Sequence, residues 1–323
     1  MAEGRTQGAA FVRAIGGYFG LELEGGEGPY SSDAAVNFGR GGLELILKTR
    51  GYTHVWLPCY ICPCVPQYLS KIGIGFSFYE VNENLEPCTF QQLARPDAFL
   101  YVDYFGIKDD FCRQLEASHK QIILDLTQAF YYKPIHADGF NSARKFFGVP
   151  DGGFVFGDGL SNRTLPDSFS FDMCDMLLRR ADGDLAGGYS AFKKAETEKE
   201  SWPAQKMSKL THLLLSQCDG EAVRRTRLRN FRYLHARLEA TNKLPVQLSG
   251  VTGPLVYPYL PSEGGGAIKA KLIQKQVFCP TFWPNLANTH KVNRELAENL
   301  VCLPIDQRYS EEDMDRILED LEK

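Results

Sequence analysis

The sequence predicts an α/β protein with a mainly parallel β-sheet and a smaller α+β domain at its C-terminal end. Short runs rich in β-branched and aromatic residues alternate with helical patterns from about residue 36 to beyond residue 160, an order typical of α/β sheets. The length of 323 residues is about twice that of a common ~150-residue domain. From about residue 245 short strands and turns replace the long helical patterns. We therefore expect a large domain of residues 1–244, including an N-terminal segment of residues 1–35, and a small domain of residues 245–323.

Composition and charge exclude several classes of protein. Hydrophobic residues make up 44% and charged residues 24% of the chain, which is typical of a globular protein with a sizeable core. The net charge is −4 and no long basic run is present, so a nucleic-acid partner is not expected. The most apolar stretches, residues 153–156 and 213–215, are far shorter than the ~20 residues of a membrane span. Residues 1–5 lack an apolar signal core, and we expect a cytoplasmic protein.

The nine cysteines do not form the pattern of a secreted disulfide-rich protein, because their number is odd and they are scattered along a long chain. We expect them to be mostly buried thiols. Cys59 and Cys62 form one Cys-x-x-Cys pair, but no second pair or suitably spaced histidine completes a four-ligand zinc site. The pair also lacks the βαβ context of a thioredoxin-like redox motif. The sequence therefore predicts no metal site.

The elements predicted for the large domain follow the order expected of a parallel sheet. A glycine turn at residues 39–42 opens a helix whose apolar residues share one face. The predicted elements are a helix at 43–48, a strand at 55–58, a helix at 64–72 and strands at 75–81, 98–102 and 121–125. Ligands of open parallel sheets bind at the carboxyl ends of the strands, so a site is expected there.

The second half of the chain has a different character. Residues 160–245 are polar, basic and helical, and the helix predicted at 222–240 carries six arginines. We interpret it as an exposed helix whose arginine stems cover apolar surface, with an anion-binding strip as the alternative. The C-terminal elements are strands at 255–260 and 277–279, a glycine loop at 264–266 and a final helix at 311–322 with Ser310 as its N-cap.

Two segments carry candidate chemistry, one around Asp125 at a strand end and one around Lys145 further along the chain. Chemistry on carbonyl groups by a cofactor such as pyridoxal 5′-phosphate requires an amine, a carboxylate beside the ring nitrogen, an anion cradle and a ring clamp. Lys145 is the candidate amine, and burial between Phe146 and Phe147 is expected to lower its pKa. Asp125 is the candidate carboxylate. Taken singly, an aspartate at the end of a buried strand usually caps a turn, and a lysine flanked by aromatic residues is most often a solvated surface residue.

The candidate phosphate cradle is the glycine-rich start of the first helix. Arg40, Gly41 and Gly42 present free backbone N–H groups at the positive end of the helix dipole. Ser142 offers a hydroxyl three residues before Lys145, and Arg40 adds a charge-assisted contact. The alternative for the glycines is a plain turn at a helix entrance.

These segments together resemble the DegT/DnrJ/EryC1/StrS sugar aminotransferases, a family of fold-type I pyridoxal-phosphate enzymes. The resemblance runs from about Asn37 to the C-terminus, and its motifs occur in the family's order. The matching segments are the glycine turn at 39–43, the proline segment at 57–62, Tyr104–Gly106, the Asp-x-x-Gln-Ala segment at 125–129, Lys145 followed by Asp151-Gly152-Gly153, and the ending at 303–314.

The resemblance implies a three-layer fold-type I large domain and a role for each matching residue. Lys145 would form the Schiff base and act as the general acid and base, while Asp125 would pair with the pyridinium nitrogen. Gln128 would lie near the ring and its phenolic oxygen. The phosphate would be held by Arg40, Gly41 and Ser142. The ring-face position of the family falls on Cys62, with Tyr60 as the alternative.

The function implied by the resemblance is transfer of an amino group from an amino acid, with glutamate as the expected donor, to a nucleotide-linked keto-sugar. Family analogy places such a reaction in cell-surface polysaccharide synthesis. The resemblance also implies a homodimer, with Tyr189 or Met207 as candidates for residues that reach a partner's site. One alternative is a sugar dehydratase, but a family member of that kind has histidine in place of the residue that Lys145 matches. The other is a non-catalytic binding or regulatory protein. Residues 15–23 do not resemble the family's N-terminal arm.

Overall fold

A seven-stranded sheet forms the centre of the structure, a computed structural model that describes residues 15–90, 93–118, 120–161, 164–199, 202–283 and 291–322. The strand order is β1-β7-β6-β5-β4-β2-β3. Adjacent strands from β6 to β3 run parallel, whereas β7 is antiparallel to both β6 and β1. The strands are β1 Ala34–Val36, β2 His54–Pro58, β3 Gly75–Tyr79, β4 Asp97–Val102, β5 Ile122–Leu126, β6 Asp138–Asn141 and β7 Gly153–Phe156. The mainly parallel α/β sheet predicted from the sequence is confirmed.

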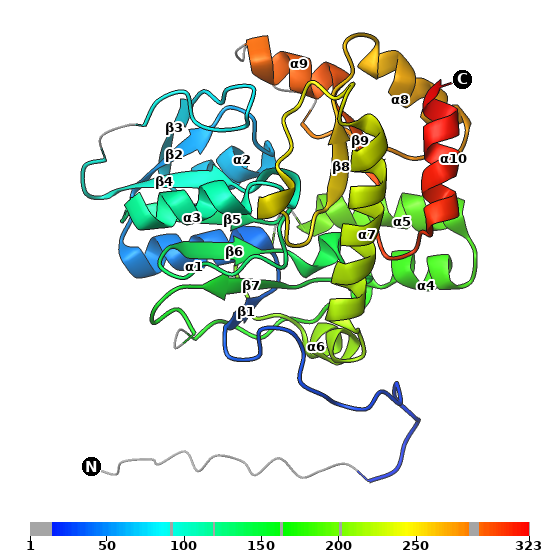
Figure 1. The fold of residues 1–323 in the computed structure, drawn as a ribbon. Helices are drawn as coiled ribbons and strands as arrows, with labels where there is room; N and C mark the ends of the chain where they lie inside the picture. Colours follow the sequence, from blue (N-terminus) through cyan, green and yellow to red (C-terminus); the bar gives the residue numbers. More distant parts are fainter. Residues whose placement is uncertain are drawn as a thin grey trace, which may run out of the picture.

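Helices flank this sheet (Figure 1). Helix α1 packs on β6 and β7, α2 on β3 and α3 on β5. The helices are α1 Gly39–Arg50, α2 Cys64–Lys71, α3 Asp109–Ser118, α4 Asp175–Ala181, α5 Leu185–Glu198, α6 Lys209–Ser216, α7 Gly220–Leu238, α8 Gly265–Gln274, α9 Lys291–Asn299 and α10 Glu311–Glu322. Short 3₁₀ turns occur at η1 Tyr104–Gly106, η2 Ala143–Lys145, η3 Phe171–Met173 and η5 Leu248–Gly250.

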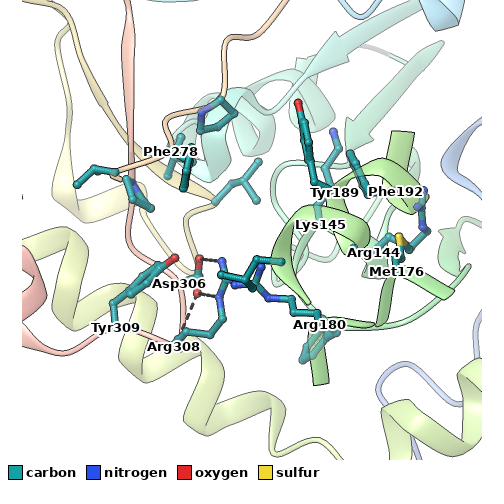
Figure 2. Close-up of a pocket in the computed structure, with 18 of the residues that line it drawn as sticks. Arg144, Lys145, Met176, Arg180, Tyr189, Phe192, Phe278, Asp306, Arg308 and Tyr309 are labelled. Atoms are coloured by element: carbon teal, nitrogen blue, oxygen red, sulfur yellow. Dashed lines mark hydrogen bonds and ion pairs between the residues drawn. The ribbon is translucent and has the colours of Figure 1, made fainter. Parts of the chain in front are cut away.

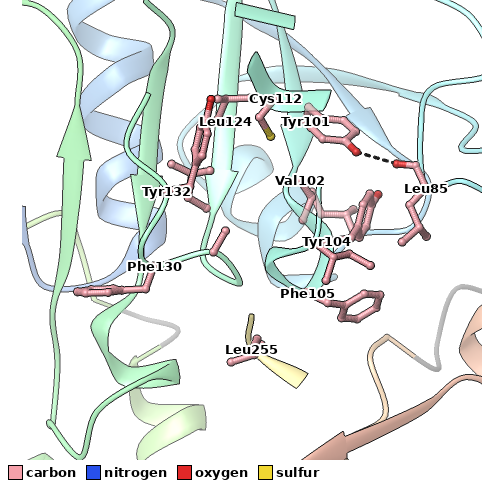
Figure 3. Packing of buried hydrophobic residues seen from close by; sticks show 14 of the residues in the cluster. Leu85, Tyr101, Val102, Tyr104, Phe105, Cys112, Leu124, Phe130, Tyr132 and Leu255 are labelled. Carbon is pink, nitrogen blue, oxygen red and sulfur yellow. Dashed lines mark hydrogen bonds between the residues drawn. The ribbon is translucent and has the colours of Figure 1, made fainter. Parts of the chain in front are cut away.

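The central strands β4 and β5 are almost entirely buried, which is what a parallel strand covered on both faces requires. Beyond β4 the chain turns through η1, where aromatic rings pack into the core, as Figure 3 shows for Tyr104 and Phe105. The hydroxyl group of Tyr101 donates a hydrogen bond to the carbonyl oxygen of Leu85 over 2.9 Å. This core holds the carboxyl end of the sheet in place, and the candidate site lies at that end.

The C-terminal part of the chain contains a two-stranded antiparallel sheet of β8 (Val256–Tyr259) and β9 (Val301–Pro304). Helix α7 packs on β8 and on α10, and α8 packs on β9 (Figure 1). The final helix begins as predicted, because the backbone N–H of Asp313 donates to the Ser310 hydroxyl oxygen over 3.4 Å. A smaller α+β region therefore follows the large sheet.

Three details differ from the sequence predictions. Residues 277–279 are not a strand, because the two-stranded sheet is formed by β8 and β9 and leaves this segment beside a cavity. Residues 264–266 are not a simple loop, since Gly264 is the N-cap of α8 with a φ angle of 73° and the next two glycines begin the helix. Only Cys112, Cys279 and Cys302 are fully buried; four cysteines are half-buried and two are exposed.

No helix in the described ranges is long and apolar enough to cross a lipid bilayer. Residues 1–5, on which the absence of a signal core is argued, lie outside the described residues.

Candidate functional site

Asp125 lies near the carboxyl end of β5 and is almost fully buried, with an exposed fraction of 5%. Its neighbours across the sheet are Val102 of β4 and Phe140 of β6. The backbone N–H of Thr127 donates to its Oδ1 atom over 2.9 Å. Burial raises the pKa of the carboxyl group, while the positive charge of Lys145 and the hydrogen bond from Thr127 oppose that rise. The carboxylate is thus buried at a strand end with one cation facing it.

Lys145 is the last residue of η2, and its amine reaches the same strand end. The Nζ atom donates to the hydroxyl oxygen of Thr127 over 3.1 Å. The flanking rings of Phe146 and Phe147 are buried, but the lysine side chain is exposed and lines a cavity (Figure 2). The predicted burial of the amine between the two rings is therefore wrong, because the rings face the core and Lys145 faces the cavity.

Gln128 is fully buried and has one unsatisfied polar atom. Its Oε1 atom accepts a hydrogen bond from the backbone N–H of Phe105 over 2.7 Å. Phe105 has a φ angle of 59°, a conformation that costs a non-glycine residue about 1 kcal/mol or more. The Nε2 atom of Gln128 has no hydrogen-bond partner among the residues that the structure describes. An amide donor is therefore held close to the end of β5 without an acceptor.

The N-terminus of α1 lies beside the same threonine. A Cβ atom built on Gly39 would be 2.9 Å from the methyl group of Thr127, so only glycine fits here without a shift. Gly41 is equally tight, with the Asn37 Oδ1 atom 2.8 Å from its hypothetical Cβ. Phe38 occupies the N-cap position and no side chain caps the helix. The first-turn N–H groups are therefore not satisfied by a capping side chain.

The two predicted phosphate-binding side chains are placed differently. The guanidinium group of Arg40 donates to the carbonyl oxygen of Lys199 over 3.0 Å and lies 5.6 Å from the centroid of the Tyr68 ring. Ser142 is half-buried and lines the cavity together with Lys145. Ser142 therefore shares the cavity with the amine, whereas Arg40 is held by Lys199 and Tyr68.

Cys62 and Tyr60, the two candidates for the ring face, lie in different surroundings. The Sγ atoms of Cys62 and Cys64 are 2.8 Å apart. The hydrogen bond with Cys64 and the charge of Lys145 lower the pKa of Cys62, and the charge of Asp125 opposes them. The sulfur of Cys62 is therefore within electrostatic range of both predicted catalytic groups.

Tyr60 is instead part of a buried aromatic cluster. Its ring stacks on Tyr104 with 5.6 Å between centroids and meets the edge of Trp283 at 4.8 Å. Its hydroxyl group donates a long hydrogen bond of 3.5 Å to the carbonyl oxygen of Phe282. The ring of Tyr60 is therefore packed against other aromatic rings, whereas the pKa of the Cys62 thiol responds to the charges of Lys145 and Asp125.

A cavity of about 730 Å³ opens beside Lys145. Its walls come from η2, from the α4–α5 pair and from C-terminal segments around residues 276–282 and 304–309 (Figure 2). Asp125 of β5 and Gln128, two residues beyond the end of that strand, are not among the residues that line the cavity. The cavity therefore extends from the lysine towards the C-terminal part of the chain and is large enough for a small organic substrate.

Several of the residues that line the cavity were not predicted from the sequence to belong to a site. Cations that line it besides Lys145 are Arg144, Arg180, Lys199, Arg227, Arg308 and Arg316. Arg144 directly precedes the predicted catalytic lysine, and that adjacency is a usable signal. Arg227 belongs to the arginine-rich α7, yet it is buried and donates to the carbonyl oxygens of Pro254 and Leu255. The prediction of an exposed helix is wrong for this one arginine.

The two residues considered for contact with a partner also differ. Tyr189 is exposed and lines the cavity of its own chain. Met207 is buried, its backbone N–H donates to the carbonyl oxygen of Ala35, and its side chain lies against Gly152. Met207 is therefore held in the interior of its own chain. No group of three or more potential metal ligands occurs within the described ranges.

Comparisons with known proteins point to one fold. No family model matches the chain. No curated protein matches it either. Solved structures do match: a DegT DnrJ EryC1 StrS aminotransferase from Brucella abortus at 17% identity, covering 90% of this chain and 84% of that one, with a TM-score of 0.63; and the sugar aminotransferase CalS13 from Micromonospora echinospora at 14% identity, covering 89% and 86%, with a TM-score of 0.63.

Two further matches were solved with bound molecules. DesI, in the presence of its TDP-sugar product, is 17% identical over 89% of this chain and 79% of its own, with a TM-score of 0.62. DesV from S. venezuelae, in complex with a ketimine intermediate, is 15% identical over 89% and 83%, also with a TM-score of 0.62. The chain therefore has the fold of the sugar aminotransferases, that of fold-type I pyridoxal-phosphate enzymes.

Proposed function

We propose that this protein is a pyridoxal-phosphate-dependent aminotransferase that moves an amino group from an amino acid to a keto-sugar. The observation that carries the proposal is the convergence of the Lys145 amine and the buried Asp125 carboxylate on Thr127, at the carboxyl end of β5. In an open α/β sheet that end is where ligands bind. Burying an aspartate opposite one exposed lysine costs stability, and a cofactor with a basic ring nitrogen gives the arrangement a use.

The polar groups of the site suit the parts of pyridoxal phosphate. Asp125 would face the ring nitrogen, and the unpartnered Nε2 atom of Gln128 would donate to the phenolic oxygen. Arg40, Gly41 and Ser142 would hold the phosphate at the uncapped start of α1. Cys62, close to Asp125 and Lys145, would lie on the ring face.

When bound, pyridoxal phosphate supplies an aldehyde and an electron sink. The residues of the chain supply the rest. The Lys145 amine would hold the aldehyde of the cofactor, and it would carry a proton to and from the substrate carbon as general base and acid. The hydroxyl group of Thr127 accepts a hydrogen bond from the lysine amine and so fixes where that proton is held. Asp125, buried and opposite this cation, stabilises a protonated ring nitrogen.

The acceptor and the donor are part of the same proposal. The wall of the cavity carries more cationic than anionic side chains, as expected for a substrate that bears phosphate or carboxylate groups. DesI was solved with a TDP-sugar product and DesV with a ketimine intermediate, which supports a nucleotide-linked keto-sugar as acceptor. Glutamate is the proposed donor. A homodimer, a cytoplasmic location, a role in cell-surface polysaccharide synthesis and a domain boundary near residue 245 are proposed with it.

Covalent trapping tests the proposal. Purified protein loaded with pyridoxal phosphate is reduced with borohydride, digested and mapped by mass spectrometry. We expect the pyridoxyl group on Lys145, and its loss in Lys145→Ala. Lys133→Ala is the matched control, because Lys133 is exposed and paired with Asp33. Absence of any label on the wild-type protein, or full labelling of Lys145→Ala, would contradict the proposal and favour a non-catalytic protein.

The reaction type is tested on the same loaded protein. An aminotransferase is expected to lose its visible absorption when glutamate is added, with release of the corresponding keto acid. Unchanged absorption across a panel of amino acids would count against transamination while leaving cofactor binding intact.

A further inference from the structure

Two cations pair with the carboxylate of Glu196 near the start of α1, and a third cation contacts one of them. The Nη1 atom of Arg144 lies 2.9 Å from the carboxylate of Glu196, and Lys199 forms an ion pair with the same carboxylate. Arg40 joins them through its hydrogen bond to the carbonyl oxygen of Lys199. The nearby Glu44, which accepts a hydrogen bond from Tyr68, is already paired with Lys48. The cluster of Arg40, Arg144, Lys199 and Glu196 thus has an excess of two positive charges.

These cations are largely removed from water. The exposed fraction of the side chain is 9% for Arg144 and 17% for Lys199. The Nε atom of Arg144 is buried and has no hydrogen-bond partner in the described part of the chain. Burial and then the charge of Arg144 lower the pKa of Lys199 to about 8. Excess buried positive charge of this kind is costly unless an anion is brought to it.

The cluster surrounds the uncapped helix start. The Cζ atom of Arg144 and the Nζ atom of Lys199 lie 5.7 and 5.8 Å from the ring centroid of Phe38, the N-cap residue of α1. Arg144 directly precedes Lys145, and Figure 2 shows both among the residues that line the cavity. A helix start, a buried unpartnered guanidinium nitrogen and a second, half-buried cation therefore lie around Phe38, and both cations line the same cavity as Lys145.

We propose that Arg144 and Lys199, together with Arg40, form the charged half of the phosphate site and bind a phosphate monoester dianion. The two excess positive charges match the two negative charges of that ligand, and the Nε atom of Arg144 gains an acceptor. The inference rests on the proposed function, since the ligand is the phosphate group of the cofactor. It adds two residues that lie outside the motifs of the family resemblance. The other reading of the cluster is a structural ion network around Glu196.

Comparing the binding of pyridoxal and pyridoxal phosphate distinguishes a phosphate site from a structural ion network, because the two compounds share the aldehyde and differ only in the phosphate. Cofactor-free protein is titrated with each, and the dissociation constant is measured from the absorption of the lysine adduct. Lys199→Met is expected to weaken pyridoxal phosphate binding by roughly 10- to 100-fold, the range that loss of a charged hydrogen bond produces. Pyridoxal binding should change by less than about twofold, since the aldehyde site is untouched. Lys199→Arg should retain most of the affinity for pyridoxal phosphate.

Lys194→Met is the matched control, because Lys194 belongs to the same helix α5 and its side chain is 77% exposed. It should bind both aldehydes as the wild-type protein does. Inorganic phosphate gives a second readout: it should raise the melting temperature of the cofactor-free wild type and of Lys194→Met, but not of Lys199→Met.

The outcomes are distinguishable. Wild-type protein that forms no adduct with pyridoxal phosphate contradicts the proposed function itself. Wild-type protein that forms the adduct, with an equal affinity in Lys199→Met or an equal loss for both aldehydes, overturns the inference and assigns the cluster a structural role.

Discussion

Asp125 and Asp151 are both buried aspartates in the large domain, and they differ in how their oxygen atoms are satisfied. Asp151 accepts hydrogen bonds from the backbone N–H of Ser208 at 3.0 Å, from its hydroxyl group at 2.8 Å, from Ser168 at 3.4 Å and from the hydroxyl group of Thr211. Asp125 accepts hydrogen bonds from a single residue, Thr127, and otherwise faces the charge of Lys145.

The pKa of both carboxyl groups is raised, and in both the largest cause is burial. Around Asp151 the hydrogen bonds from Thr211 and Ser208 oppose the rise. Around Asp125 the main opposing influence is the charge of Lys145, which is carried by an exposed side chain. Asp151 therefore ties α6 to the segment after the lysine as a completed polar network, whereas Asp125 has Thr127 and the charge of Lys145 as its partners.

The largest effect on stability is expected from a substitution that removes the hydrogen bonds of Asp151. Asp151→Ala should lower the free energy of unfolding by about 3 kcal/mol, because the N–H of Ser208 and the hydroxyl group of Thr211 lose a buried acceptor. Urea unfolding followed by circular dichroism measures the change. Asp151→Asn keeps an oxygen acceptor and should cost about half as much. A loss below about 1 kcal/mol in the alanine variant would mean that this network does not stabilise the fold.

Replacing Asp125 is expected to have a smaller effect on stability, and the effect should be stabilising. Asp125→Asn should make the cofactor-free protein more stable at pH 7, by about 1 kcal/mol or less, while weakening pyridoxal phosphate binding. The pKa of Asp125 is raised in the folded state, so its ionisation lowers stability as the pH rises above the unfolded value of about 3.9.

Thermal unfolding of the cofactor-free wild-type protein and of Asp125→Asn across the pH range shows which of the two is more stable at each pH. The advantage of the asparagine variant should vanish below about pH 4, where the carboxyl group is protonated in both states. A variant that is less stable than wild type at neutral pH would show that Asp125 supports the fold as Asp151 does.

The smallest effect is expected at Tyr60. Tyr60→Phe should change the free energy of unfolding by about 0.5 kcal/mol or less, because its hydroxyl group makes only a 3.5 Å hydrogen bond. Cofactor affinity, measured by absorption titration, should stay the same. Tyr104→Phe is the control and should cost about 1 kcal/mol, since that hydroxyl group donates to the carbonyl oxygen of Tyr60 over 2.8 Å. Weakened cofactor binding in Tyr60→Phe would show that the hydroxyl group of Tyr60 contacts the cofactor.

Local patterns are sufficient to predict the elements that frame the site. The strand predicted to end at Asp125, the glycine-rich start of α1 and the final helix capped by Ser310 each depend on neighbouring residues. Each is present, and the strand ends one residue later than predicted, at Leu126. Strands β6 and β7 are not singled out by their sequences, because both are four residues long and contain glycine. These two strands form because neighbouring strands provide their backbone hydrogen-bond partners.

The chemistry of the site depends on contacts between distant parts of the chain. Residues 277–279 have the composition of a strand, but strand formation needs a free partner, and β8 pairs with β9 instead. Nothing around Lys199 in the sequence indicates that it meets Arg144 at the start of α1. The exposure of Lys145 beside buried phenylalanines is likewise decided by where the cavity lies. Periodicity and capping are interactions within a few residues, whereas burial and the pairing of charges follow from how the whole chain packs.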